Sequence, residues 1–255
     1  MTDYYAGGSL FYHLRKSRGF AEPRARMYSA ELLLALAHLH EHGIIYRDLK
    51  LENVLMDHHG HIALTDFGLS KENLENVQDA QLTTFCGTAE YIAPELLKGH
   101  KYGAAVDWWS FGVLLYEMMG FRTPFYDKNR KMMFQAIISS AINFPVFFSD
   151  DARDCLEGLL KKDPHARLGS GAGGADEIKA HAFYAPLDFG ELFDRKVPAP
   201  FKPEVASELD VKYVPKTYLQ ARAEDSIDPA AAKPARGAKP ASEFSGFTYV
   251  QPSKM

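Results

Sequence analysis

The stretch that decides the fold of this chain reads Tyr-Arg-Asp-Leu-Lys-Leu-Glu-Asn at residues 46–53. Two shorter motifs follow it in order, Asp-Phe-Gly at 66–68 and Ala-Pro-Glu at 93–95. Short apolar runs flank an Asp-His-His-Gly turn at 57–60, which predicts a β-hairpin between the first two motifs. A long polar loop is expected over 70–90, and loops of that length in compact domains are usually functional.

The regions around these motifs carry helical patterns. The clearest covers residues 22–42, where leucines and alanines form a wide apolar face. The segment 107–120 is apolar nearly all round, so it is predicted to be a fully buried helix with Asp107 as its N-cap. Further helices are predicted over 9–17, 129–140, 149–160 and 176–181.

Composition excludes several classes of protein. The chain has 255 residues and a net charge of −4, whereas binding nucleic acid through bulk electrostatics needs a basic face. Its two cysteines are too few for a disulfide framework or a zinc site, and they favour a reduced cytoplasmic or nuclear protein. The longest apolar stretches fall short of the roughly 20 residues of a membrane span, so no membrane insertion is predicted.

The ordered set of motifs resembles the catalytic loop, the metal-binding loop and the end of the activation segment of protein kinases. An Asp-Phe-Gly triplet by itself is more often part of an ordinary loop. The resemblance therefore rests on the complete set of motifs in this order. Tyr46, where many kinases have His, is usual in the AGC group. The sequences at 48–53 and 66–72 point to the branch of protein kinase B, the serum/glucocorticoid-induced kinases and the ribosomal-protein kinases.

The resemblance implies specific roles in phosphoryl transfer, a reaction that depends mostly on positioning and electrostatics. Asp48 would accept or orient the proton of a substrate hydroxyl, and Lys50 would offset charge on the γ-phosphate of ATP, as in kinases for serine and threonine. Asn53 and Asp66 would hold Mg²⁺, which prefers oxygen ligands. Thr88 resembles the threonine that hydrogen-bonds the catalytic Asp and Lys.

Other positions resemble structural residues of the family. Glu95 and Arg167 match a buried ion pair, and Asp107 matches the aspartate that holds the backbone of the catalytic loop. Tyr46 and Phe67 resemble regulatory-spine residues, and plain core packing is a second explanation that is compatible with the first.

The resemblance also implies a fold class: a mainly helical large lobe of protein-kinase-like α+β type, followed by an AGC C-terminal tail. The chain begins with a stretch like the kinase hinge, so the backbone at Asp3 and Tyr5 would contact adenine, with Leu55 beneath the ring. No Gly-rich phosphate loop or strand lysine precedes the catalytic loop in this sequence, so the small lobe is expected to be absent. The expected divisions are a hinge remnant at 1–8, the large lobe at 9–184 and the tail at 185–255.

The activation loop carries a predicted regulatory site. Thr84 lies in Thr-Thr-Phe-Cys-Gly-Thr at 83–88, which resembles the AGC activation loop. A phosphate placed on Thr84 by an upstream activating kinase would pair with Arg47 and Lys71. Ala89 stands where the family usually has proline, which is expected to loosen this loop.

The tail carries two further predicted phosphorylation sites. Phe-Ser-Gly-Phe-Thr-Tyr at 244–249 matches the AGC hydrophobic motif, with Thr248 as its phosphosite. It follows a stretch poor in apolar residues, 221–243, that is expected to be a disordered linker. An aromatic end that packs on its own domain is the plainer alternative. Ser226 is the predicted turn-motif site, and Thr217 is the alternative.

Three acids match positions that receive substrate arginines in basophilic relatives. They are Glu52, Glu90 and Glu117, and they predict protein substrates with basic residues near the acceptor Ser or Thr. The hinge acid of those relatives is replaced here by Ser9. The preference for arginine is therefore expected to be weaker three residues before the acceptor.

Two functions from different classes fit the sequence. The first is a serine/threonine protein kinase that uses ATP and Mg²⁺, with this chain inactive by itself for lack of the small lobe. The second is a non-catalytic binding or decoy module. An ATP-independent scaffold is a weaker third, because every large-lobe catalytic residue is intact. The DNA upstream of Met1 separates the first two, since an in-frame small lobe supports the enzyme and a stop codon supports the decoy.

Overall fold

The computed structural model describes residues 3–72, 87–214 and 216–219. The predicted sites at Thr84, Ser226 and Thr248 lie outside the described residues, as does the motif at 244–249. The chain divides into two compact units, Met1–Val214 and Pro215–Met255. The described part of the second unit is helix α9 (Lys216–Leu219).

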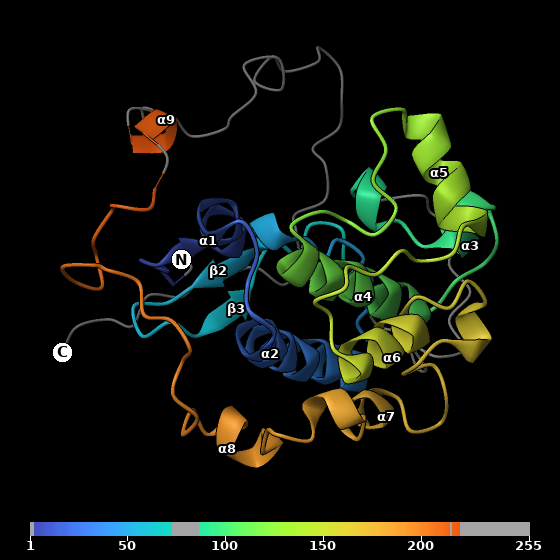
Figure 1. The fold of residues 1–255 in the computed structure, drawn as a ribbon. Coiled ribbons are helices and arrows are strands. Elements are labelled where there is room, and N and C mark those ends of the chain that lie inside the picture. Colours follow the sequence, from blue (N-terminus) through green and yellow to red (C-terminus); the bar gives the residue numbers. More distant parts are fainter. Residues whose placement is uncertain (1–2, 73–86, 215, 220–255) are drawn as a thin grey trace, which may run out of the picture. The chain divides into compact units, whose positions relative to one another are not determined.

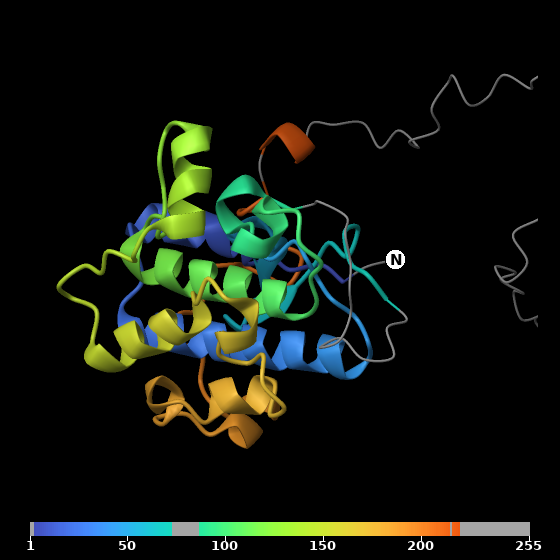
Figure 2. The ribbon, with the colours of Figure 1, turned by 90° about the vertical axis from the view of Figure 1, so that its right-hand side faces the viewer.

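Helices form the body of the first unit (Figures 1 and 2). Helix α4 (Ala105–Gly120) contacts both α2 (Glu22–Glu41) and α6 (Asp150–Leu159). Because α4 is apolar on nearly every side, it can be surrounded by other elements, and its predicted burial is confirmed. Among the described residues, no helix has both the length and the apolar character needed to cross a membrane. The other helices are α1 (Leu10–Ser17), α3 (Pro94–Leu97), α5 (Arg130–Ser139), α7 (Ala175–Lys179) and α8 (Phe189–Phe193), with 3₁₀ turns at Leu51–Asn53, Ala89–Tyr91, Pro164–Ala166 and Ala182–Tyr184.

Polar side chains begin several of these helices. The hydroxyl of Ser9 accepts from Tyr12 N at 3.3 Å, and that of Ser149 accepts from Ala152 N at 3.1 Å. Asn129 caps α5 in the same way. The helices predicted to start at 9, 129 and 149 therefore begin one residue later, because the first predicted residue is the N-cap.

The N-cap predicted for α4 is wrong. The helix begins at Ala105 after Ala104, which offers no side-chain cap, and Asp107 lies in the first turn. The carboxylate of Asp107 accepts hydrogen bonds from Tyr46 N and Arg47 N instead. The Asp107 carboxylate oxygens that could have capped the helix are therefore bound to the catalytic loop, which is distant in sequence.

A small antiparallel sheet supports the catalytic loop. Its order is β1 (Gly8–Ser9), β2 (Val54–Met56), β3 (Ile62–Leu64), with Gly8 opposite Met56 and Val54 opposite Leu64. The predicted hairpin is confirmed as β2–β3. Strand β1 was not predicted, since two residues are too short for a periodic signal.

The residues after α8 cross back over this sheet as a tail strap, defined as 197–213. Phe201 lies 5.1 Å from the His13 ring, and the Arg24 guanidinium lies 4.3 Å from the centre of the Phe201 ring. Tyr213 is buried against Tyr12 and His13, with ring centres 5.4 and 5.1 Å apart. The strap therefore packs against the body of the first unit through Phe201 and Tyr213.

Gly60, in the hairpin turn, is where the strap comes closest to the sheet. Its φ is +96°, and a Cβ there would lie 1.9 Å from the carbonyl oxygen of Phe201. Backbone strain of this kind costs about 1–3 kcal/mol by itself. We expect Gly60→Ala to lower the free energy of unfolding by more than that, because the clash with the Phe201 carbonyl oxygen is added to the strain. Gly99→Ala is the matched control, since Gly99 also has a positive φ, +68°, but no atom within 4 Å of its Cβ position. Urea unfolding of both variants measures the difference, and equal losses would contradict the close approach of the strap.

Candidate active site

Asp107 holds the start of the catalytic loop. Its Oδ2 accepts from Tyr46 N and from His40 Nε2, both at 2.8 Å, and its Oδ1 accepts from Arg47 N at 2.8 Å. The residue is completely buried, so these bonds satisfy a carboxylate that water does not reach. Arg47 has a φ of +69°, a conformation that costs energy outside glycine. The Asp107 contacts therefore fix a strained backbone immediately before Asp48.

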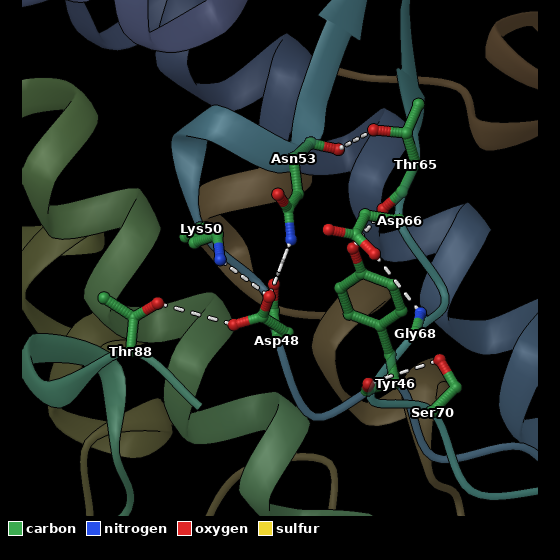
Figure 3. A network of polar contacts seen from close by, with 9 residues as sticks. All are labelled: Tyr46, Asp48, Lys50, Asn53, Thr65, Asp66, Gly68, Ser70 and Thr88. Atoms are coloured by element: carbon green, nitrogen blue, oxygen red, sulfur yellow. Dashed lines mark hydrogen bonds and ion pairs between the residues drawn. The ribbon is translucent and has the colours of Figure 1, made fainter. Parts of the chain in front are cut away.

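Asp48 is the centre of a polar network (Figure 3). Its Oδ2 accepts from Lys50 Nζ at 2.7 Å and from Asn53 Nδ2 at 3.0 Å, and its Oδ1 accepts from Thr88 Oγ1 at 3.4 Å. Thr88 lies in the segment that leads into the Ala-Pro-Glu motif at 93–95. The fold thus brings together the four residues to which the resemblance assigns catalysis.

Asp66 lies beside this network (Figure 3). The backbone oxygen of Asn53 accepts from Thr65 N at 2.9 Å and from Thr65 Oγ1 at 3.0 Å, which places the next residue, Asp66, alongside. Asp66 is exposed, has a φ of +60°, and accepts from Gly68 N at 3.2 Å. Both strained residues of this region, Arg47 and Asp66, are therefore at the candidate site.

The donor set here fits Mg²⁺. Asn53 uses its amide nitrogen on Asp48, which leaves the amide oxygen and the exposed Asp66 carboxylate as hard oxygen ligands. No group of three or more His, Cys, Asp or Glu side chains in the described part of the chain could hold a metal. One carboxylate with few other protein ligands is typical of Mg²⁺, which keeps waters and substrate phosphates in its shell.

Two aromatic residues connect the loops. The Tyr46 hydroxyl donates to the Thr65 carbonyl oxygen, and its ring centre lies 5.5 Å from that of Phe67, edge to face. Burial raises the pKa of the Tyr46 phenol, so the hydroxyl remains a donor. Phe67 is half exposed, at 50%, although its ring contacts that of Tyr46.

Arg47 extends toward the activation segment. Its Nε donates to the Leu69 carbonyl oxygen at 2.6 Å, and its Nη1 donates to the Tyr102 hydroxyl at 3.1 Å. Lys71 pairs through its backbone with Ile45, which holds it near the same loop. Because Thr84 lies outside the described residues, its predicted pairing with Arg47 and Lys71 stays a prediction.

Glu95 and Arg167 form a bidentate pair deep in the core. Nη1 donates to Oε1 at 2.7 Å and Nη2 to Oε2 at 2.9 Å, and both residues are buried. Two further guanidinium hydrogens, on Nε and Nη1, go to the carbonyl oxygens of Lys161 and Ala105, at 3.1 and 2.6 Å. The pair therefore ties the Ala-Pro-Glu motif to the start of α4 and to the turn after α6.

The three predicted substrate acids lie within electrostatic range of one another. Burial, and then the charges of Glu90 and Glu52, raise the pKa of Glu117 to about 7, although the Tyr91 hydroxyl donates to its Oε2. Burial and the charge of Glu52 also raise the pKa of Glu90. Burial is the main cause of both pKa shifts, and repulsion between the carboxylates adds to it, so a cation bound beside them would favour their charged forms.

Of the predicted adenine contacts, Leu55 lies on β2, and Asp3 and Tyr5 lie in the segment before β1. Leu55 is half-buried on β2, opposite Ser9. Asp3 is exposed, and the Tyr5 carbonyl oxygen accepts from Gly8 N at 3.1 Å. Leu55 thus lies on the central strand of the sheet, and Asp3 and Tyr5 precede β1. The contacts of these three residues with adenine stay a prediction.

Sequence reasoning missed two residues of the site. His40 binds Asp107 across 67 positions of sequence, and no local pattern signals such a contact. Thr65 supports Asn53 through two hydrogen bonds. Its position directly before Asp66 was an available signal, because a hydroxyl next to a metal ligand often orients it.

Known proteins match this chain closely. The family described as the protein kinase domain matches residues 1–184. RAC-beta serine/threonine-protein kinase A of Xenopus laevis and RAC-beta serine/threonine-protein kinase of Homo sapiens are each 47% identical over 213 residues, or 84% of this chain and 43% and 44% of those proteins. The RAC family serine/threonine-protein kinase homolog of Dictyostelium discoideum is 45% identical over 260 residues, or 100% of this chain and 55% of that protein. The chain spans about half the length of the curated relatives it matches.

Proposed function

This chain belongs to the protein kinase family, in its AGC group, and on that premise we propose that it carries the catalytic loop of an ATP-dependent serine/threonine protein kinase. The observation that supports this function most directly is the Asp48 carboxylate, held by Lys50, Asn53 and Thr88 with Asp66 alongside. The relatives it matches are named as serine/threonine kinases.

Each residue then has a chemical task. The hydroxyl oxygen of a substrate Ser or Thr attacks the γ-phosphorus of ATP, the bond to the β-phosphate oxygen breaks, and ADP leaves. Asp48 orients that hydroxyl and accepts its proton, because its carboxylate is fixed by three donors. Lys50 donates to Asp48 at 2.7 Å, and its positive charge would offset negative charge that develops on the transferred phosphoryl group. Asn53 and Asp66 would hold Mg²⁺, which neutralises phosphate charge when bound.

We also propose that these 255 residues need a small lobe to complete the reaction. A Gly-rich loop and a strand lysine normally cover the phosphates of ATP, and neither motif precedes the catalytic loop in this sequence. The test joins the small lobe of a matched RAC-beta kinase to this chain before Met1. Transfer of labelled phosphate from ATP to a serine peptide is expected from the fusion and not from the chain alone. A fusion that binds the peptide without transfer would favour the binding module.

The substrates proposed are proteins with arginine near the acceptor residue. Glu52, Glu90 and Glu117 lie within electrostatic range of one another, and their repulsion adds to the effect of burial in raising the pKa values of Glu117 and Glu90. The guanidinium of an arginine side chain would bind these carboxylates through charge-assisted hydrogen bonds.

This proposal predicts a pH dependence of peptide binding. The pKa of Glu117 is raised to about 7, so its carboxyl is largely neutral at pH 6 and ionised at pH 8. The dissociation constant of an arginine-rich serine peptide is therefore expected to fall about tenfold, or about 1.4 kcal/mol, as the pH rises from about 6 to about 8. Fluorescence anisotropy of a labelled peptide, titrated with the chain, measures it.

Two variants test the assignment of this pH dependence. Glu117→Gln is expected to weaken binding at pH 8 and to remove the change between the two pH values. Glu157→Gln is the matched control, because Glu157 is exposed on α6 and is not among the charges that shift the pKa of Glu117 or Glu90. A pH dependence that survives in Glu117→Gln would contradict the role of Glu117.

A further inference from the structure

The end of helix α2 carries two histidines that lie one helical turn apart (Figure 1). His38 is in the last turn of the helix, and His42 is its C-cap. Side chains four residues apart are neighbours on a helix surface, and the two ring centres here are 4.2 Å apart, with 50° between the planes. Both residues are exposed, so they form a pair of imidazoles that solvent and ions can reach.

A hydrogen bond sets the orientation of the His42 ring. Its Nδ1 lies 2.8 Å from the carbonyl oxygen of His38, which only accepts, so Nδ1 carries the hydrogen and Nε2 has a free lone pair. Metal-binding histidines nearly always donate from their second ring nitrogen in this way. The imidazole of His38 has no hydrogen-bond partner in the described part of the chain. Each ring therefore has a nitrogen available as a metal ligand.

The histidine between these two has a different task. His40 Nε2 is bound to the Asp107 carboxylate at 2.8 Å, and its side chain is only 7% exposed. Residues two positions apart do not face each other on a helix, so His40 does not share the surface of His38 and His42. An ion held by the exposed pair would leave the support of the catalytic loop in place.

A second close pair of imidazoles lies in the hairpin turn. The ring centres of His58 and His59 are 3.8 Å apart, but His58 Nε2 lies 3.2 Å from the Glu208 carboxylate. That carboxylate competes with a metal ion for the ring nitrogen. No acid contacts His38 or His42 in the part of the chain that the structure describes, so the pair at the end of α2 is the better ligand set.

We propose that His38 and His42 together bind one Zn²⁺ ion, with water in its other positions. Imidazole nitrogens suit Zn²⁺, and two histidines four residues apart on a helix hold Zn²⁺ in metalloproteases. Two nitrogens at 2.0–2.1 Å from one tetrahedral ion lie about 3.4 Å apart, which rings with centres 4.2 Å apart can span. The C-terminal end of a helix also favours a cation. The described residues hold no group of three or more such ligands, so the protein supplies two.

The test measures Zn²⁺ binding by the whole 255-residue chain, in competition with a zinc indicator dye. Excess Mg²⁺ is present to occupy the oxygen ligands of the candidate active site. His38→Gln and His42→Gln are each expected to weaken Zn²⁺ binding about tenfold or more, because the second ligand no longer acts at high effective concentration. Both positions are exposed and glutamine is a good helix former, so the fold is retained. His165→Gln, at an exposed position outside α2, is the matched control and is expected to bind as the unchanged chain does.

Cu²⁺ locates the site in the same chain labelled with ¹⁵N. Imidazole sites bind Cu²⁺ more tightly than Zn²⁺, and this paramagnetic ion broadens the signals of nearby amides. Less than one equivalent is expected to broaden the signals of residues 38–42 before those of the hairpin turn at 57–61. The proposal is overturned if the signals of 57–61 broaden first, or if His38→Gln and His42→Gln bind Zn²⁺ as the unchanged chain does. It is also overturned if His165→Gln weakens binding as much as they do, or if Mg²⁺ displaces the Zn²⁺.

Discussion

Glu95→Ala is expected to lower the free energy of unfolding of this chain by about 3–5 kcal/mol. The change leaves the Arg167 guanidinium buried without its counter-charge, because Nη1 and Nη2 both donate to Glu95 in a site from which water is excluded. Hydrogen bonds from Arg167 to two carbonyl oxygens remain, but a dipole does not replace a charge. Denaturant unfolding followed by circular dichroism measures the loss.

Two further variants separate the buried pair from a general loss of charge. Glu95→Leu combined with Arg167→Met is expected to regain at least half of the lost stability, since an apolar pair leaves no charge buried alone. Asp194→Ala is the control, because it removes an ion pair with Lys196 in which the side chains are 52% and 65% exposed, and surface pairs contribute about 1 kcal/mol or less. A loss of that small size for Glu95→Ala would contradict the burial of the pair.

Asp48→Asn is expected to lower phosphoryl transfer by the small-lobe fusion about 10²- to 10⁴-fold. An amide keeps the shape of the carboxylate and still accepts from Lys50, so the loop is expected to fold as before. What it loses is the capacity to take the proton of the substrate hydroxyl. The rate at saturating peptide and ATP measures the effect, with little change expected in peptide affinity.

The control for Asp48→Asn is an Asp→Asn substitution outside the candidate active site. Asp151→Asn changes an exposed carboxylate in the first turn of α6 and is expected to leave the rate unchanged. If Asp48→Asn keeps most of the rate, Asp48 does not accept the proton and the proposed mechanism is wrong. If it loses the rate together with the folded structure, thermal unfolding of the same sample shows that.

Local patterns predicted much of the fold. The apolar face over 22–42 gave α2 almost to the residue, and the turn at 57–60 gave the β2–β3 hairpin. The family resemblance, which rested on the order of three motifs, is confirmed by the match to the protein kinase domain over residues 1–184. The sequence predicted these features because each of their signals lies within a short stretch of neighbouring residues.

The rest depended on contacts between distant residues. Asp107 was expected both to cap α4 and to hold the catalytic loop, and the structure shows its carboxylate bound to the loop and to His40 of α2 instead of capping α4. Nothing in the sequence near His40 indicates that it would reach Asp107. Strand β1 exists because β2 pairs with it, which no two-residue pattern predicts. The same lack of local signal explains why the position of the tail strap was not foreseen.

The close approach at Gly60 also limits how this protein can change over generations. A lineage that gains any side chain at position 60 must first reroute the backbone at Phe201, since the two cannot share the space. The hairpin turn and the strap, about 140 positions apart in the chain, are therefore expected to change together. Related chains that carry a larger residue at this turn are expected to have a shorter, displaced or missing strap. The residue at position 60 therefore indicates which path the tail strap takes.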